Sequence, residues 1–522
     1  MLFIMQHRKE YQLLKRKINK SIMGGHKMRK IKIIKRILCI SPVLLFLVLM
    51  QACVNTKNKD DLKKPNVVYI LADQWRAQAT SYNGDPNVKG RTPNLDRIAE
   101  TGLNYRNAVS VCPVCTPHRA ALLTGRYPTS TGMFFNDLHL PADEYNMAEI
   151  FKEAGYQTAY IGKWHLDGMG RFEFTPAERR QGFDYWKALE CSHDYNNLLY
   201  YSGDSDQKHY WAGYGPYAET NDAIDYIREH SDGEKPFLLF LSWGAPHFPH
   251  HTAPERFQNI FREEGISLAP NVPDEMKEKA KEESVGYYSH IMALDSCIGK
   301  LQKTLEEENI SGNTIFVFSS DHGEMMGAHS VRPKLKQLAY AESVRVPFLL
   351  KYPAVFGNEK IIVNSPINTP DILPTILDLA DIPVPKSVEG KSMAQAITNP
   401  DAFADKAAVV MSVSPFDNPE NDEYRGIYTS RYTYIENLEG PWLMYDNEKD
   451  PFQMNNLVDN PEYENLLKEL DSKLSEKLNT IGDEFRPRDY YIEKWGYKLN
   501  KWGHIDYSAD AEPQGPGLNK DK

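Results

Sequence analysis

The sequence lacks an excess of positive charge. Its 522 residues include 61 lysines and arginines against 71 aspartates and glutamates, a formal net charge of −10 at pH 7. Proteins that bind DNA or RNA without sequence preference need a basic face, so the sequence argues against a nucleic-acid partner. An anionic small molecule is not excluded, because a local basic pocket can exist inside an acidic protein.

The N-terminal region lacks an apolar run long enough for a typical membrane span. The run "ILCISPVLLFLVLM" (37–50) has 14 residues, and a spanning helix needs about 20. It follows the basic segment "KMRKIKIIKR" (27–36), an order typical of a targeting leader. The leader (1–53) ends in "MQAC", which resembles a bacterial lipoprotein lipobox. We therefore expect export to the periplasm or its membrane, with a lipid anchor on Cys53 and a polar tether over 54–65. A plain signal peptide or a single anchor helix is the alternative.

Cysteine is scarce, with six residues in the whole chain. Cys39 and Cys53 belong to the leader, and the other four are scattered at positions 112, 115, 191 and 297. Four scattered cysteines in an exported protein of this size do not make a disulfide framework.

Four short apolar runs each end abruptly in polar residues. They are "NVVYILADQ" (66–74), "QTAYIGKWH" (157–165), "PFLLFLSWGAPH" (236–247) and "NTIFVFSSDH" (313–322). Continuous apolar runs are typical of strands buried on both faces, and their alternation with helices predicts a mostly parallel α/β sheet. Because ligands of such sheets bind beyond the carboxyl ends of the strands, the polar ends predict one shared site.

Helical patterns lie between these runs and after them. They cover residues 93–101, 145–154, 218–230, 276–308 and 370–383. Beyond about residue 405 the pattern changes to short antiparallel strands and an amphipathic helix over 460–478. We therefore expect a large α/β domain over 66–400 that holds the site, a smaller α+β subdomain over 405–505 and a loose tail over 506–522.

Cys112 and Cys115 lie three positions apart in "SVCPVCTPHRAALLTGR" (110–126). A zinc site needs a second ligand pair at metal spacing, and none follows. A thioredoxin-like redox pair would open a helix in a small fold with one active strand end, whereas four strand ends converge here. The spacing of the two cysteines therefore does not explain the segment.

The residues that follow Cys115 set it apart from Cys112. Proline stands two positions after Cys115 and Arg119 four positions after it. The run predicts a helix that begins at or just after Cys115, tolerates Pro117 in its first turn and stops at Gly125. A helix N-terminus with a nearby guanidinium favours a tetrahedral oxyanion beside Cys115.

Two segments match motifs of a known family. "CTPHRAALLTGR" (115–126) fits the sulfatase pattern C-x-P-x-R…T-G-R, and "GYQTAYIGKWH" (155–165) fits the second motif of that family. Further blocks, such as "DHGEMMGAH" (321–329) and "NTPDILPTILDLADIP" (368–383), follow in the family's order over nearly the whole exported chain. The sequence thus resembles the formylglycine-dependent, type I sulfatases, and in particular exported carbohydrate sulfatases of bacteria. The resemblance implies the alkaline-phosphatase-like α/β fold with a small C-terminal subdomain, in agreement with the pattern of strands and helices.

The resemblance implies a modified nucleophile and a metal ion. A maturation enzyme would convert Cys115 to Cα-formylglycine (3-oxoalanine), whose hydrate attacks the sulfur of the ester. The implied metal ligands are Asp73, Gln74, Cys115, Asp321 and His322. Mostly oxygen ligands suit a hard cation, Ca²⁺ first and Mg²⁺ second. Gln74 and His322 depart from a common family pattern with a second aspartate and an asparagine, which lowers the negative charge of the site.

The resemblance also implies which cations hold the sulfate group. These are Arg119, Lys163 and Lys336, which would offset charge in the transition state. Lys336 is preferred over its rival Lys334 because it lies four residues before Tyr340, where the family's active lysine falls.

Two histidines take the acid–base roles in this reading. His165 would accept the proton in the step that releases sulfate, and His247 would protonate the leaving oxygen. His250 and His251 lie close to His247 in "APHFPHH", and the register of the motif favours His247.

The function implied by the resemblance is hydrolysis of sulfate esters, with a sulfated carbohydrate as substrate. Irregular aromatic and polar stretches at 190–211 and 329–336 predict the sugar subsite, since loops at strand ends usually set specificity. The candidate residues are His193, Asp194, Tyr195 and Arg332.

Two other functions fit the same sequence. A phosphonate monoester or phosphodiester hydrolase would keep the fold, the nucleophile and the metal site, because phosphate and sulfate are nearly isosteric. A surface lipoprotein that binds sulfated glycans without catalysis would have lost a nucleophile or a metal ligand, whereas every motif position here is filled. Cys112 has no role in any of these readings, and either packs as a small apolar residue or pairs with another cysteine.

Overall fold

The computed structural model describes residues 63–415, 422–507 and 511–518. The chain divides into two compact units, residues 1–63 and 64–522, and the second is described below. The expected leader, its Cys53 and nearly all of the tether lie outside the described residues. Within the described part of the chain, no helix is both long and apolar enough to cross a bilayer.

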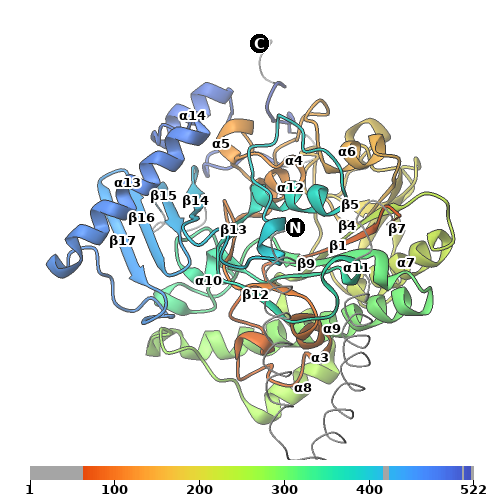
Figure 1. Ribbon diagram of the computed structural model, residues 1–522, viewed down its shortest axis with the longest axis horizontal. Coiled ribbons are helices and arrows are strands. Elements are labelled where there is room, and N and C mark those ends of the chain that lie inside the picture. Colours follow the sequence, from red (N-terminus) through yellow and green to blue (C-terminus); the bar gives the residue numbers. More distant parts are fainter. Residues whose placement is uncertain (1–62, 416–421, 508–510, 519–522) are drawn as a thin grey trace, which may run out of the picture. The chain divides into compact units, whose positions relative to one another are not determined.

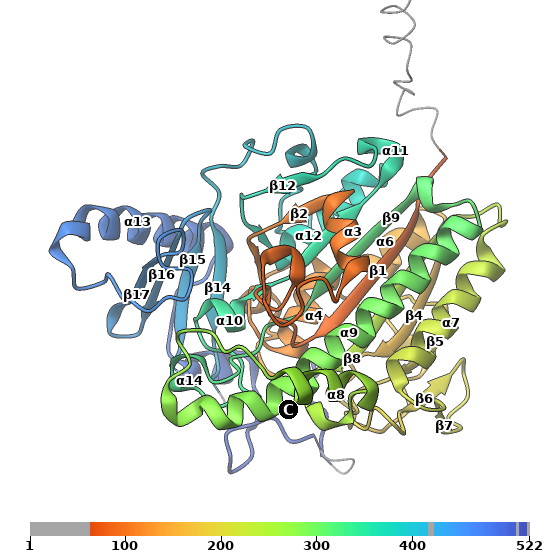
Figure 2. The same cartoon turned by 90° about the horizontal axis from the view of Figure 1, so that it is seen from below.

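A ten-stranded sheet forms the centre of the described unit (Figures 1 and 2). Its strands are β1 (Asn66–Asp73), β2 (Leu103–Tyr105), β4 (Gln157–Lys163), β5 (Tyr185–Leu189), β6 (Leu199–Ser202), β7 (His209–Tyr210), β8 (Phe237–Pro246), β9 (Thr314–Ser320), β11 (Phe348–Lys351) and β12 (Ile361–Val363). Their order is β12-β2-β11-β9-β1-β8-β4-β5-β6-β7. All four apolar runs of the sequence are confirmed as strands, and they form the parallel centre β9-β1-β8-β4.

The side chains of β1 alternate between two apolar layers. Val68 and Ile70 pack in one layer with residues of α3 (Pro93–Glu100), α7 (Gly215–His230) and α9 (Lys277–Glu307). Val67 and Tyr69 pack in the other layer with residues of α4 (Cys115–Thr124), α6 (Met147–Glu153) and α12 (Thr369–Leu379). Burial on both faces explains why the strand sequences are continuously apolar, and it confirms the predicted α/β class.

The C-terminal part forms a separate four-stranded antiparallel sheet, seen in blue beside the main sheet in Figure 1. Its strands are β14 (Ala408–Ser412), β15 (Tyr424–Tyr428), β16 (Tyr432–Asn437) and β17 (Gly440–Asp446). The predicted amphipathic helix is α13 (Glu464–Ile481), which buries Leu470, Leu474 and Leu478 against the sheet. It is followed by α14 (Arg488–Trp495).

The remaining elements are short. A three-stranded sheet combines β10 (Arg345–Val346), β3 (Ala108–Val109) and β13 (Ile367–Asn368). Further α-helices are α5 (Pro128–Thr131), α8 (Glu255–Glu264), α10 (Ala341–Val344) and α11 (Pro353–Phe356). Turns of 3-10 helix cover Ser81–Asn83, Ala177–Arg179, His250–Thr252, Asp274–Met276, Ser311–Asn313, Ala328–Ser330, Ala394–Ile397 and Pro461–Tyr463.

The described part of the C-terminal tail is packed, which corrects the prediction of a loose segment over 506–522. The side chain of Gln514 makes two hydrogen bonds to the backbone of Lys498, accepting from its N–H at 2.6 Å and donating to its carbonyl at 2.7 Å. The backbone carbonyl of Gln514 accepts from the backbone N–H of His139 at 2.8 Å. Proline, glycine and charge predicted looseness, but these long-range hydrogen bonds hold the backbone in place.

A buried ion pair ties the C-terminal elements together. Arg425 of β15 donates to Asp483, which follows α13, and also to the hydroxyl of Tyr491 in α14. Both charged side chains are fully buried. Because both charges are buried, removing one partner would leave the other without solvent or counter-charge. The same contacts couple strand β15 to α14 and to the end of α13.

Replacing Asp483 by alanine is therefore expected to leave an uncompensated buried charge and to lower the free energy of unfolding by about 3–5 kcal/mol. The midpoint of thermal or urea unfolding measures this loss. The matched control is Glu464→Ala, whose pair with Lys468 is exposed and screened by solvent, so its loss should leave the midpoint nearly unchanged. Equal shifts in the two variants would contradict the prediction.

Candidate active site

The parallel centre of the sheet brings the polar strand ends to one place. Asp73 ends β1, Lys163 ends β4, Asp321 follows β9, and His247 follows β8. Cys115, the first residue of α4, lies among them. All five side chains are buried. The shared site predicted from the ends of the apolar runs is thus present at the carboxyl edge of the sheet.

The predicted start and stop of the helix after Cys115 are also present. Helix α4 begins at Cys115 and ends before Gly125, which has a φ of 66°. Glycine reaches this left-handed conformation without the penalty that a side chain would bring. The turn fixes the length of the helix and leaves Cys115 at its N-terminus, where free backbone N–H groups collect.

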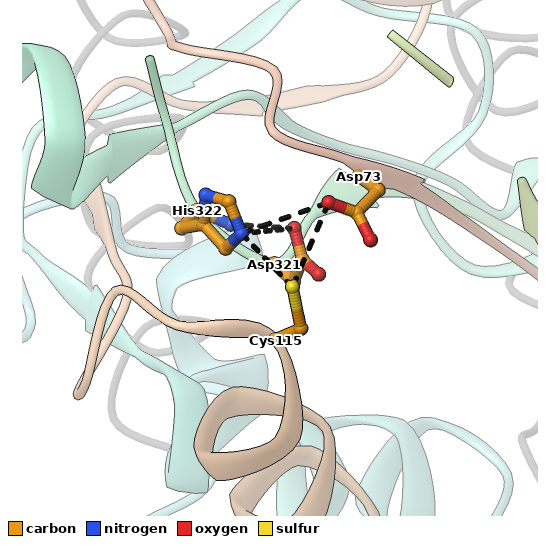
Figure 3. Close-up of side chains that lie close together, drawn as sticks. All are labelled: Asp73, Cys115, Asp321 and His322. Atoms are coloured by element: carbon orange, nitrogen blue, oxygen red, sulfur yellow. Dashed lines mark hydrogen bonds and ion pairs between the residues drawn. The ribbon is translucent and has the colours of Figure 1, made fainter. Parts of the chain in front are cut away.

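Four side chains point toward one another in a compact group, drawn in Figure 3. They are Asp73, Cys115, Asp321 and His322, and one potential ligand atom from each lies within 4.8 Å of the others. The Nε2 atom of His322 is 3.6 Å from a carboxylate oxygen of Asp73 and 3.7 Å from one of Asp321. These distances are too long for hydrogen bonds and leave space between the three atoms.

The protonation of His322 fits a metal ligand. Its Nδ1 atom lies 2.9 Å from the carbonyl oxygen of Gly323, which assigns the proton to Nδ1 and the lone pair to Nε2. Burial lowers the pKa of His322 to about 4, so the ring is neutral near pH 7. A lone pair and two carboxylates therefore converge with no proton between them, an arrangement that suits a divalent cation.

Gln74 supplies a further oxygen next to this group. Its amide nitrogen donates to Glu324 at 2.5 Å, whereas its Oε1 atom is buried and has no hydrogen-bond partner. Buried polar atoms without a partner are uncommon and call for an explanation. An amide oxygen is a usual ligand of Ca²⁺, so the orphan atom fits the metal set expected from the sequence.

Two lysines flank the sulfur of Cys115. The Nζ atom of Lys336 is 3.2 Å from Sγ, and that of Lys163 is 3.6 Å from it. Lys163 also donates to Asp73 at 2.6 Å. The rival Lys334 instead forms an ion pair with Glu283 at 2.6 Å. Of the two candidates, Lys336 is the one that the structure brings to Cys115.

Arg119 lies behind the carboxylates, where it contacts Asp73 and Asp321 at 3.1 and 3.2 Å. It is not among the residues that line the cavity described below. The sequence predicted that Arg119 holds the sulfate; in the structure two buried carboxylates engage its guanidinium, which orients them.

The charge of Asp73 depends on these neighbours. Burial alone would raise the pKa of its carboxyl, but Lys163, with His247, Arg119 and His322, lowers it well below its usual range. Burial likewise raises the pKa of the Cys115 thiol to about 11, helped by Asp73. The unmodified cysteine is thus a protonated thiol near pH 7.

His165 is held by a residue that the sequence did not reveal. Its Nε2 atom lies 2.7 Å from a carboxylate oxygen of Asp137, and its Nδ1 atom is buried without a partner. Burial lowers the pKa of His165 well below its usual value and raises that of Asp137 to about 6. A neutral ring that donates through Nε2 to Asp137 keeps its lone pair on Nδ1. Asp137 lies in "FFNDLHL", which carries no motif that could have identified it.

In His247 the proton lies on Nδ1 and the lone pair on Nε2, the reverse of His165. Its Nδ1 atom lies 2.9 Å from the carbonyl of Phe248, and its Nε2 atom lies 3.2 Å from Nζ of Lys336. Nε2 therefore accepts a hydrogen bond from the ammonium group. His250 contacts Glu283 at 2.7 Å, outside this group, and His251 is exposed. Of the three histidines in the motif, His247 is the one that lines the same cavity as Cys115.

A cavity of about 370 Å³ opens onto these residues, a volume within the ~300–1,000 Å³ typical of small-molecule sites. Cys115, Lys163, His165, His247 and Lys336 all line it. One wall comes from the far end of the chain and consists of Asn500, His504, Ile505 and Tyr507. Composition alone gave no signal for this wall, because the segment was expected to be the end of the subdomain and the start of a loose tail.

Of the four predicted sugar-binding residues, one lines the cavity. His193 lines the cavity and stacks on His247, with ring centres 4.2 Å apart. Tyr195 is fully buried and donates its hydroxyl proton to the carbonyl of Gly244, which corrects its assignment: it supports strand β8 and does not face the cavity. Asp194 and Arg332 are exposed and are not part of the lining.

Cys112 packs as an apolar residue. It is fully buried in the core layer on the α4 side of the sheet, and burial raises the pKa of its thiol to about 12. All four cysteines of the described chain are free thiols. Of the two alternatives for Cys112, packing is confirmed.

Comparisons with known proteins agree with this site. A family model described as "Sulfatase" matches residues 65–382, and one described as "N-sulphoglucosamine sulphohydrolase, C-terminal" matches residues 334–480. An ulvan-active sulfatase of Formosa agariphila is 53% identical over 446 residues, which cover 85% of this chain and 87% of the relative. An endo-4-O-sulfatase of Bacteroides thetaiotaomicron is 29% identical and covers 83% of this chain and 95% of its own.

Solved structures show the same fold. The crystal structure of a putative sulfatase yidJ from Bacteroides fragilis has a TM-score of 0.74 at 29% identity, over 84% of this chain and 100% of that chain. Another, in complex with its substrate D-glucosamine-2-N,6-O-disulfate, has a TM-score of 0.71 at 25% identity, over 81% of this chain and 99% of that chain.

Calcium is expected to stabilise protein that has first been stripped of divalent ions with EDTA. Because an ion that binds only the folded state stabilises it by mass action, Ca²⁺ at 100 times its dissociation constant adds about 2.7 kcal/mol. Thermal unfolding measures the shift. Asp321→Asn should remove most of it, whereas Asp194→Asn, a change at an exposed carboxylate outside the group, should keep it. No shift with either Ca²⁺ or Mg²⁺ would contradict the metal site.

Proposed function

The chain belongs to the sulfatase family, and from that premise we propose that it hydrolyses a sulfate ester of a carbohydrate and releases inorganic sulfate. The observation that carries the proposal is the surrounding of Cys115. Two lysine ammonium groups lie within 3.6 Å of its sulfur, beside a group of side chains that suits a divalent cation. Positive charge on two sides of one atom suits a tetrahedral anion that is attacked there.

A carbohydrate substrate is supported by the relatives and by the cavity. The relatives include an ulvan-active sulfatase and an N-acetylglucosamine-6-O-sulfatase, and one solved structure holds a sulfated glucosamine. The volume of about 370 Å³ admits a small ring with its sulfate group. The polar lining, with aromatic rings of His193 and Tyr507, suits hydroxyl groups and the flat face of a sugar.

We further propose that Cys115 is modified to formylglycine before it acts. The hydrate of that aldehyde would supply two hydroxyls on one carbon, the first to displace the alcohol from sulfur and the second to release the sulfate as the aldehyde re-forms. The position of Cys115 at the N-terminus of α4 supports this role, because the partial positive charge of the helix end favours an oxyanion there.

A divalent cation would be held by Asp73, Asp321 and His322, with Gln74 and residue 115 completing its ligands. When bound, it would offset charge on the sulfate and favour the deprotonated nucleophile. Lys163 and Lys336 contact the same centre and would bind the sulfate oxygens. Arg119 acts through the carboxylates that it orients.

His247 is the proposed acid. In the resting site its Nε2 accepts from Lys336, and burial keeps the ring neutral. An anionic ester between the two would offset the lysine charge that opposes protonation of the ring. His247 could then carry a proton on Nε2 and pass it to the leaving oxygen as the sulfur–oxygen bond breaks.

His165 is the proposed base for sulfate release. Its unpartnered Nδ1 can accept the proton of the second hydroxyl. Asp137 is the positioning residue, because it accepts from Nε2 and thereby keeps the lone pair on Nδ1. The positive charge that forms on the ring would be stabilised by this carboxylate.

Export and lipid attachment at Cys53 are proposed from the leader residues alone. The mass of the mature N-terminus of natively expressed protein tests both, because an unprocessed leader would contradict them.

Sulfate release from ulvan, N-acetylglucosamine-6-O-sulfate and a 4-nitrophenyl sulfate ester tests the activity. A phosphonate monoester with the same leaving group serves as the control. Turnover of at least one sulfated carbohydrate above the phosphonate is expected, and dominant phosphonate turnover would overturn the proposal.

Cys115→Ala is expected to lose activity by at least about 10⁴-fold, because it removes the nucleophile. Mass spectrometry of the natively expressed peptide around Cys115 should show the thiol replaced by an aldehyde. The matched control is Cys112→Ala, which shortens a packed side chain three residues away and should keep most of the activity. A fully thiol-bearing, active enzyme would exclude the modified nucleophile.

Asp137→Asn is expected to lower kcat by about 10²- to 10⁴-fold with little change in KM. An amide can donate as well as accept, so the lone pair is no longer held on Nδ1 of His165. In the enzyme without substitutions, kcat should fall as pH falls through about 6, where Asp137 takes up a proton and loses its charge. The variant should lack this step in the pH profile, whereas Asp143→Asn, at an exposed position, should retain it.

A further inference from the structure

Arg171 lines the same cavity and has been given no role so far. It lies in the segment between β4 and β5, and its guanidinium carbon is 5.3 Å from the ring centre of Tyr507. The contact places the guanidinium over an aromatic ring of the C-terminal wall. Such stacking holds the group while its N–H edges remain available.

The cations of the lining outnumber its carboxylates. Four cationic side chains line the cavity, Lys163, Arg171, Lys334 and Lys336, against the single carboxylate of Asp137. Lys163 pairs with Asp73 and Lys334 with Glu283, while Lys336 contacts Cys115 and His247. Asp137 is engaged by His165. Among the described residues, none forms an ion pair or a side-chain hydrogen bond with the Arg171 guanidinium.

Neighbouring arginines of the same segment show what a structural role looks like. Arg179 makes a two-pronged contact with Asp167. Arg180 donates to Asp204 and to the carbonyls of Thr175 and Gly203. Both guanidinium groups thus donate their hydrogen bonds to acceptors within the protein. Arg171 differs from them in facing the cavity with its hydrogen-bond donors unused.

We propose that Arg171 forms a second anion subsite, which binds a carboxylate or a second sulfate group of the substrate. This inference rests on the proposed function, because the anion must belong to a sugar whose ester group lies at Cys115. A guanidinium edge matches the two oxygens of either group with two parallel hydrogen bonds. The substrate class is therefore an acidic, sulfated oligosaccharide that carries a negative charge besides the ester that is cleaved.

The test uses three synthetic disaccharides that share the sulfated sugar found active in the panel above. The neighbouring sugar is a hexuronic acid in the first, its carboxyl-reduced neutral counterpart in the second, and that counterpart carrying a second sulfate in the third. The enzyme without substitutions is expected to prefer the first or the third disaccharide over the second by roughly tenfold to a hundredfold in kcat/KM. A preference for the first identifies a carboxylate, and for the third a sulfate.

Arg171→Ala should abolish that preference mainly through KM, because the subsite binds substrate and transition state alike. On the neutral disaccharide, assayed well above pH 6 because Arg171 helps to lower the pKa of Asp137, the variant's kcat/KM should stay within about twofold of the enzyme without substitutions. Arg171→Lys keeps the charge but not the paired donors and should retain part of the preference. The matched control is Arg256→Ala, which removes an exposed arginine that also stacks on a tyrosine, Tyr217, outside the cavity.

The outcomes separate this inference from the proposed function. If no sulfated carbohydrate in the panel is cleaved, the proposed function fails and not the subsite alone. If the neutral disaccharide is cleaved as well as the charged ones, or if Arg171→Ala slows all three equally, the second anion subsite is overturned.

Discussion

The site depends on one buried carboxylate, that of Asp73 at the end of the central strand. One oxygen contacts Lys163 and Arg119, and the other faces His322 and Cys115. A charge buried alone would be costly, and here two cations keep it ionised. The same contacts fix both lysine and arginine in place. The proposed metal site and the proposed sulfate site therefore both depend on the carboxylate of Asp73, which ends the central strand of the fold.

Local backbone geometry sets the protonation of two of the three histidines around this centre. His247 and His322 each direct Nδ1 to the carbonyl of the next residue in the chain, so that Nε2 faces the site. Their tautomers follow from short-range structure and do not depend on distant partners. His165 is the exception, because its orientation comes from Asp137, 28 residues away in sequence. That dependence on a distant side chain makes its geometry easier to disturb.

The sequence predicted the parts of the site that repeat a pattern. Apolar runs with polar ends located Asp73, Lys163, His247 and Asp321, because parallel strands share one carboxyl edge. It could not predict contacts that arise only when distant segments meet, such as Asp137 on His165 or Tyr507 on Arg171. It also placed Tyr195 in the cavity, since composition cannot tell an exposed tyrosine of a loop from one whose hydroxyl is buried against a strand.

The wall built from residues 500–507 brings to the cavity a segment that is distant in sequence from its other lining residues. Every side chain proposed to act on the ester is encoded before residue 340, whereas one wall of the cavity, with the tyrosine ring that contacts Arg171, is encoded at residues 500–507. During synthesis the reactive centre emerges well before its cavity is closed. Changes in residues 500–507 would therefore alter the shape of the cavity, and with it the sugar that is accepted, without replacing any residue proposed to break the bond.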